Sequence, residues 1–170
     1  MAKTPAAKSL TKRGSLKRHP SMATLDVPHA DKLEKVRLVV EAAASVPTGM
    51  DSDTLGAKTG LGDRHAQYHA HGARVLGLAD KKDKNWVATS AGRALLKTTP
   101  NSDEERQVFR EAMKSSNALV RKAVFGPEMS MEELTTLIEK AGFSNSSARR
   151  RAACLRTWRR SIQKEQKATT

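Results

Sequence analysis

The sequence predicts a mostly α-helical protein in which a winged helix is followed by a second helix-turn-helix. Three observations predict this fold: apolar residues at helical spacing, a glycine turn between two expected helices, and two short apolar segments around a polar tip. We divide the chain into a disordered basic tail (1–30), a winged-helix domain (31–98), a connecting helix (99–125), a second helix-turn-helix (126–163) and a disordered C-terminal tail (164–170).

The first three expected helices form the core of the winged helix. Residues 33–43 have an apolar face at helical spacing, with Arg37 elsewhere on the helical wheel, and the segment 47–49 ends this helix. Asp51 is a good N-cap for a short second helix, and the turn 60–62 contains two glycines. Asp63 is expected to cap the third helix, 63–76. Its predicted inner face is Ala66, Ala70, Ala73 and Leu76.

A hairpin is expected after the third helix. Residues 76–79 and 86–88 are short apolar segments, and residues 80–85 between them are polar. This hairpin is the predicted wing, and a further helix begins near Ala91.

The second half of the chain contains two stronger helix signals. Ser130 and Glu133 form a capping-box pattern at the start of one helix, and a turn at 141–145 separates it from the last helix, about 147–163. The predicted buried stripe of that last helix is Ala148, Ala152, Leu155, Trp158 and Ile162.

The net charge of +13 is concentrated at the two ends of the 170-residue chain. Residues 1–25 carry six basic and no acidic side chains, residues 149–170 carry eight basic and one acidic, and the remainder is balanced. Basicity of this kind points to an acidic polymer as partner, with nucleic acid the leading candidate. Together with the predicted winged helix, it makes double-stranded DNA the expected partner. For the N-terminal tail, a phosphate-contacting arm and a purely solubilising segment remain equal alternatives.

The candidate DNA-binding residues fall into three groups. In the third helix, Arg64, Gln67 and His71 are placed nearest to base edges, with Arg74 on the same outward side. In the wing, Lys81, Lys82 and Lys84 suit phosphate contact. In the last helix no acid compensates the arginines, which match phosphate oxygens and guanine edges. The arginines chosen there are Arg149, Arg150, Arg156, Arg159 and Arg160.

Other chemistry is weakly supported by the sequence. His65 and His69 share a helical face but lack further ligands, so no metal site and no cofactor are predicted. Cys154 is expected to be a structural thiol rather than a reactive one. No enzyme signature is present. Asp80 and Lys82 have the Asp-x-Lys spacing of some nuclease sites, but they lie on the predicted wing tip. No apolar run is long enough to span a membrane and no signal peptide is visible, so we expect a cytoplasmic, nucleoid-associated protein.

Residues 33–97 resemble the winged-helix module of some bacterial restriction endonucleases and related defence proteins. The resemblance is carried by the segments 64–69, 74–78 and 87–96, and segments 147–151 and 155–158 resemble the second helix-turn-helix that trails such modules. In those proteins the module binds DNA and a separate domain cuts it. The resemblance implies a DNA-recognition subunit or regulator beside a restriction or defence system, with a nuclease or methyltransferase subunit as a possible partner.

Two alternatives stay open at this point. One is a metal-dependent DNA nuclease or nickase. The other is a protein-binding adaptor subunit of a defence complex.

Overall fold

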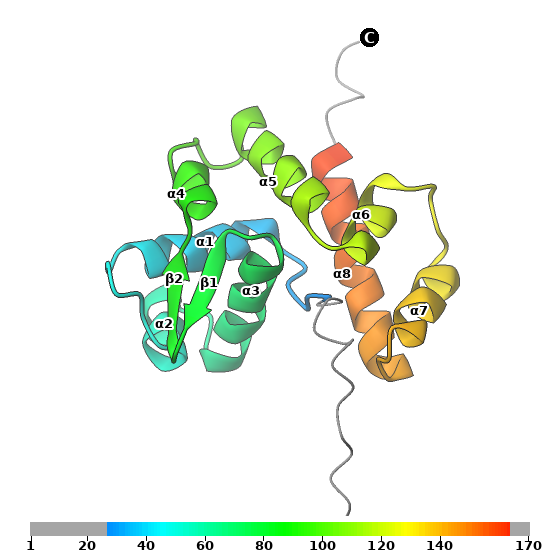
Figure 1. Cartoon of the computed structure of the whole chain (residues 1–170), viewed down its shortest axis with the longest axis horizontal. Helices are drawn as coiled ribbons and strands as arrows, with labels where there is room; N and C mark the ends of the chain where they lie inside the picture. Colours follow the sequence, from blue (N-terminus) through cyan, green and yellow to red (C-terminus); the bar gives the residue numbers. More distant parts are fainter. Residues whose placement is uncertain (1–26, 164–170) are drawn as a thin grey trace, which may run out of the picture.

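The computed structural model describes residues 27–163, which form eight helices and a two-stranded antiparallel sheet (Figure 1). The prediction of a mostly helical fold is confirmed. No helix in this part of the chain combines the length and the apolar character needed to cross a membrane. In chain order the elements are α1 (Leu33–Ala44), α2 (Ser52–Thr59), α3 (Asp63–Val75), β1 (Ala79–Lys82), β2 (Asn85–Ala88), α4 (Ser90–Leu96), α5 (Asp103–Ser115), α6 (Ala118–Phe125), α7 (Met131–Lys140) and α8 (Asn145–Gln163).

Helices α1, α2 and α3 pack around a small apolar cluster. Asp51 caps α2 as predicted, its Oδ1 accepting a hydrogen bond from the Thr54 amide at 2.8 Å. Gly60 and Gly62 both have positive φ, 68° and 69°, and so make the tight turn into α3. Asp63 does not cap α3, because it is already the first helical residue and Gly62 is the N-cap. The predicted inner face of α3 is buried throughout.

The hairpin is held against this cluster by Trp86. β1 pairs antiparallel with β2, with Ala79 opposite Ala88. Trp86 is 5% exposed, exchanges backbone hydrogen bonds with Met50, and donates from Nε1 to Ser52 Oγ at 3.2 Å. The hairpin therefore projects from a fixed base, while its tip residues are exposed.

The connecting segment 99–125 is not one helix as predicted but two, α5 and α6. Ser116 is buried, and its Oγ donates to the backbone oxygen of Val75 at 2.8 Å. Asn117 then caps α6, its Oδ1 accepting from the Val120 amide at 3.0 Å. The apolar spacing across 109–123 continues through this corner, which hid the break in the sequence pattern.

Helices α7 and α8 match their predicted patterns closely. The capping box of Ser130 and Glu133 is present, with both reciprocal hydrogen bonds. All five residues of the predicted α8 stripe are buried, at 2% exposure or less. α8 packs on α5, α6 and α7.

The segment before α1 was assigned to the tail by the sequence, but residues 27–30 belong to the core. Val27 and Ala30 are fully buried. The backbone oxygen of Ala30 accepts hydrogen bonds from Trp158 Nε1 at 2.6 Å and from Cys154 Sγ at 3.1 Å. The main apolar cluster accordingly runs from Val27 through α1 and α4 to α8, so the two halves share one core. Residues 1–26 and 164–170, which contain the rest of the expected tails, lie outside the described residues.

Gly72 lets α3 approach this segment. A Cβ atom at position 72 would lie 2.6 Å from the Cβ of Ala30. Real Cβ atoms do not approach so closely, so the segment 27–30 fits between α3 and α8 only because position 72 lacks a side chain.

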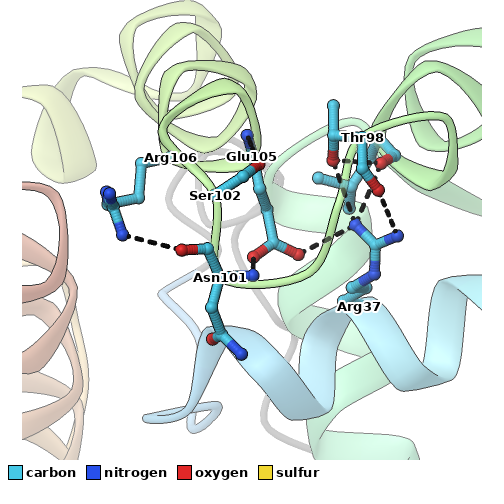
Figure 2. Close-up of polar contacts among 7 residues, drawn as sticks. Arg37, Thr98, Asn101, Ser102, Glu105 and Arg106 are labelled. Atoms are coloured by element: carbon cyan, nitrogen blue, oxygen red, sulfur yellow. Dashed lines mark hydrogen bonds and ion pairs between the residues drawn. The ribbon is translucent and has the colours of Figure 1, made fainter.

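A buried ion pair joins α1 to the first turn of α5 (Figure 2). Arg37 lies outside the apolar stripe of α1, yet it is 9% exposed, and its Nη1 contacts Glu105 Oε1 at 2.8 Å. Arg37 also donates to the backbone oxygens of Leu95 at 3.0 Å and Thr98 at 2.8 Å. The second Glu105 oxygen accepts from the Asn101 amide at 2.6 Å. Both oxygens of Glu105 and both Nη atoms of Arg37 thus have hydrogen-bond partners, as a buried ion pair requires.

We predict that Gly72→Ala destabilises the protein. Helix propensity alone favours alanine over glycine by about 1 kcal/mol. The close approach to Ala30 should reverse that sign and lower the free energy of unfolding by about 1–3 kcal/mol, the usual cost of overpacking. Urea unfolding followed by circular dichroism measures it, with the exposed neighbour Arg74→Ala as control. A more stable Gly72→Ala protein would contradict the packing described here.

We predict that Glu105→Ala lowers the free energy of unfolding by about 3–5 kcal/mol, because Arg37 is left as a buried charge without its carboxylate. The double variant Arg37→Met, Glu105→Leu should lose less than Glu105→Ala. Denaturant titration of the three proteins measures this, with the exposed Glu41→Ala as control, expected within about 0.5 kcal/mol of the wild type. Equal losses for the single and double variants would show that the pair is not coupled.

Candidate nucleic-acid interface

The outer face of α3 presents the side chains that the sequence placed there. Arg64, Gln67 and Arg74 are exposed and His71 is partly exposed. Arg64 is held in one orientation, because its Nε donates to Tyr68 Oη at 2.7 Å and its guanidinium carbon lies 5.5 Å from the centre of the Tyr68 ring. A fixed arginine loses less freedom on binding a ligand than a mobile one.

His29 connects this face of α3 to α8. Its ring centre lies 5.3 Å from that of Tyr68. Burial, together with the positive charges of Arg151 and Arg150 and of His71 and Arg64, lowers the pKa of His29 from 6.5 to about 4. Two of these neighbours belong to α3 and two to α8, so both helices direct positive charge toward one point. We call Arg64, His71, Arg150 and Arg151, whose charges act on His29, the α3–α8 basic surface.

Three residues of this region were missed by the sequence analysis. His29 lies in a stretch without helical periodicity and was assigned to the tail. Tyr68 and Arg151 were visible on their helices but not chosen. Arg151 donates to Ser147 Oγ at 3.1 Å and lies over the Phe143 ring, 4.3 Å from its centre, so it is also partly structural.

The remaining arginines of α8 border acidic residues of other elements. Arg149 lines a depression of about 300 Å³ together with Glu132 and Glu139 of α7. Arg156 and Arg160 line a smaller one, about 40 Å³, beside Glu128. No acid compensates these arginines within α8, but the fold supplies carboxylates from neighbouring elements. The positive potential of this face is therefore weaker than the sequence of α8 indicates.

Arg159 has a structural position that departs from the prediction. Its Nη1 donates to the backbone oxygens of Gly126 at 2.8 Å and Ala123 at 3.2 Å. These oxygens belong to the C-terminal end of α6, where carbonyl groups lack helical partners and a cation is favourable. Arg159 thus joins α8 to α6, and we assign it to the fold rather than to the interface.

The hairpin supplies three exposed lysines, Lys81, Lys82 and Lys84. Lys81 Nζ lies 5.3 Å from the centre of the Trp86 ring. In Figure 1 the hairpin tip, the start of α3 and the start of α8 all lie toward the lower edge of the molecule. The three predicted groups of basic side chains thus belong to elements that reach the same end.

The other candidate chemistry is placed as follows. His65 is exposed, whereas His69 is 3% exposed. The Nδ1 atom of His69 is hydrogen-bonded to the backbone oxygen of His65 at 2.8 Å. Within the described residues, no three His, Cys, Asp or Glu side chains are grouped so as to hold a metal ion. Cys154 is 2% exposed, and burial raises the pKa of its thiol, so it stays protonated. Asp80 lies on the exposed hairpin, and its Oδ1 accepts from the Lys81 amide.

We predict that acid destabilises the protein through His29. Its folded-state pKa of about 4 lies below the ordinary 6.5, so the unfolded chain takes up the proton first. The free energy of unfolding should therefore fall as the pH drops from about 6.5 to 4. Burial lowers the pKa of His69 as well, with the same sign. Urea unfolding between pH 7 and 4.5 should show a shallower decline for His29→Gln than for the wild type. Identical declines would exclude His29 as a source.

We predict that Arg159→Ala destabilises the fold, whereas Arg160→Ala does not. Removing Arg159 leaves two backbone oxygens at the end of α6 without their partner, at a cost of about 1–3 kcal/mol. Arg160 is exposed, so its removal should change stability by less than about 0.5 kcal/mol. The midpoints of urea unfolding of both variants measure the difference. Equal midpoints would mean that the contacts of Arg159 are not stabilising.

Comparison of the chain with models of protein families, with curated proteins and with solved structures finds no match. The candidate interface is therefore supported by its own geometry and charge.

Proposed function

We propose that the protein binds double-stranded DNA through a winged helix formed by α1 to α4 and the hairpin. The observation that carries this proposal is the α3–α8 basic surface. Side chains from two helices far apart in sequence, Arg64 and His71 of α3 and Arg150 and Arg151 of α8, are near enough to His29 to lower its pKa. Such a concentration of positive charge on one side is the electrostatic footprint of a nucleic-acid-binding protein.

Within this proposal α3 is the recognition helix. Arg64 and Gln67 are exposed in its first half, the part that reaches base edges when such a helix enters the major groove. Arg64 is suited to the O6 and N7 atoms of guanine and Gln67 to adenine. Arg150, Lys81, Lys82 and Lys84 are suited to phosphate oxygens, which position the protein without reading sequence. Arg156 and Arg160 remain candidate phosphate contacts. We expect them to contribute less to binding, because Glu128 lines the same depression and offsets part of their positive charge.

The wider role that we propose is that of a DNA-recognition subunit or regulator beside a restriction or defence system, acting in the cytoplasm at the nucleoid. This role is supported by the resemblance of residues 33–97 and of α8 to the modules of such systems. A nuclease or methyltransferase subunit is the partner of matching chemistry. Co-purification with a tagged copy of this chain from its own cells tests the partner.

Duplex affinity should fall steeply as salt increases. If about four to six phosphates are neutralised, the logarithm of the association constant should fall against the logarithm of salt with a slope of about −4 to −5. Fluorescence anisotropy with a random 20-base-pair duplex between 50 and 200 mM KCl measures the slope. An affinity independent of salt, or no binding at the lowest salt, would refute the proposed function.

Single substitutions should separate the α3–α8 basic surface from the rest of the molecule. Arg150→Ala should weaken binding to all duplexes alike and make the salt slope shallower by about one. Arg156→Ala should have a smaller effect. The control is Arg93→Ala, because Arg93 is exposed in α4, at the opposite end of the molecule from the start of α8 (Figure 1). Arg64→Ala should instead relax the sequence preference found by random-site selection. An equal loss in Arg93→Ala and Arg150→Ala would place binding elsewhere.

A further inference from the structure

An open cleft of about 480 Å³ lies between α3 and α8, beside the α3–α8 basic surface. Its walls come from α3, α8, the start of α1 and the segment before it. Clefts in this size range accommodate small molecules or single residues of a polymer. The function proposed above uses one residue of this lining, Arg150, and leaves the rest of the cleft unassigned.

His69, which lines the cleft, carries a buried hydrogen-bond acceptor without a partner. Its Nδ1 lies 2.8 Å from the backbone oxygen of His65, which only accepts, so Nδ1 carries the ring proton and Nε2 has a free lone pair. His69 is 3% exposed, and Nε2 has no hydrogen-bond partner among the described residues. The nearest acidic oxygen, Oδ1 of Asp31, is 4.0 Å from Nε2, and Asp31 also lines the cleft.

The two acceptors, His69 Nε2 and the carboxylate of Asp31, favour a ligand that donates hydrogen bonds. A buried acceptor without a partner is costly, so a group with N–H bonds is favoured between Nε2 and Asp31. An amino group carries two such bonds and is able to donate to both. Burial lowers the pKa of His69, so the ring is neutral at pH 7 and remains an acceptor.

The charges of the cleft restrict the ligand further. Lys32, Lys35 and Arg150 line it, against the single carboxylate of Asp31. A cationic amine is disfavoured by this excess of positive charge. A ligand with an anionic group beside a neutral amino group satisfies both features, and phosphate suits lysine and arginine.

One side of the cleft is aromatic. The Tyr68 ring lies 6.3 Å from the ring of His65, edge to face, and 5.3 Å from that of His29, and both His29 and His65 line the cleft with Tyr68. Aromatic side chains of this kind are good partners for a flat heterocycle.

We propose that this cleft binds one nucleotide whose base carries an exocyclic amino group. The amino group donates to His69 Nε2 and Asp31, the base lies against the Tyr68 side, and the phosphate is held by Lys32, Lys35 and Arg150. The same chemistry is offered by a free mononucleotide and by a base extruded from a DNA strand. The site does not depend on the proposed duplex binding, because its acceptors, rings and charges are all in place without it.

Isothermal titration of the full chain with AMP tests the proposal. The matched ligand is purine riboside 5′-monophosphate, which has the same ring, sugar and phosphate but no amino group. AMP should bind about tenfold more tightly than this analogue, as expected for the loss of a bond to a buried acceptor. AMP should also shift the side-chain ¹⁵N resonance of His69 Nε2. Equal affinities, an unshifted His69, or inorganic phosphate binding as tightly as AMP would overturn the proposal.

Variants separate the parts of the site. Asp31→Ala and Arg150→Ala change exposed residues and should each weaken AMP binding about tenfold, while His69→Phe should remove the preference for AMP over the analogue. The controls are Asp53→Ala and Arg93→Ala, exposed residues of α2 and α4. If His69→Phe does not fold, the Asp31 and Arg150 variants decide the matter alone. Unchanged AMP affinity in both of them would overturn the site.

A second arm distinguishes the two sources of the nucleotide. A duplex with 2-aminopurine opposite an abasic site reports unstacking of that base by increased fluorescence. An increase that is lost in Asp31→Ala identifies the ligand as a base of a strand, whereas AMP binding without any increase identifies a free nucleotide. If the protein binds no duplex at all, the proposed function fails and the AMP titration still decides the cleft. The absence of both AMP binding and a fluorescence increase would overturn the inference.

Discussion

The arrangement of the whole molecule depends on one backbone oxygen, that of Ala30. Trp158 and Cys154 of α8 both donate hydrogen bonds to this oxygen. Gly72 of α3, which has no side chain, leaves the space that Ala30 occupies. These contacts fix a short extended segment between two helices that would otherwise have little reason to lie near each other. This junction ties α8 to the segment that lies against α3, while the packing of α8 on α5, α6 and α7 holds its other faces.

Because of this junction, basic side chains of α3 and α8 that are far apart in the sequence lie near each other in the fold. The middle of the chain is neutral overall, yet Arg64 and His71 of α3 lie close enough to Arg150 and Arg151 for all four to act on His29. On the other side of α8 the positive charge is less available. Arg149 lies near Glu132 and Glu139, and Arg159 is hydrogen-bonded to the end of α6. The fold therefore decides which arginines are available to an acidic polymer.

The parts of the fold with local causes were predictable from the sequence. The stripe of α8, the capping box of Ser130, the glycine turn before α3 and strand β2 follow from short windows of sequence. The first strand does not, because it is the polar segment Ala79–Lys82 and not the predicted apolar segment 76–79. The break at Ser116 was not, because its cause is a hydrogen bond to Val75, far away in the chain. The burial of Arg37 and the roles of His29 and Arg159 were missed for the same reason: each depends on partners more than thirty residues distant.

The single core that runs through both halves has a thermodynamic consequence. Two DNA-reading modules joined by a flexible linker lose relative freedom when both engage one ligand, and that loss subtracts from affinity. Here the relative position of α3 and α8 is already fixed in the free protein by the Ala30 junction. Preorganisation of this kind converts more of the contact energy into binding. For the duplex binding proposed above, it also means that only one spacing between the two contacted stretches of DNA backbone suits the protein.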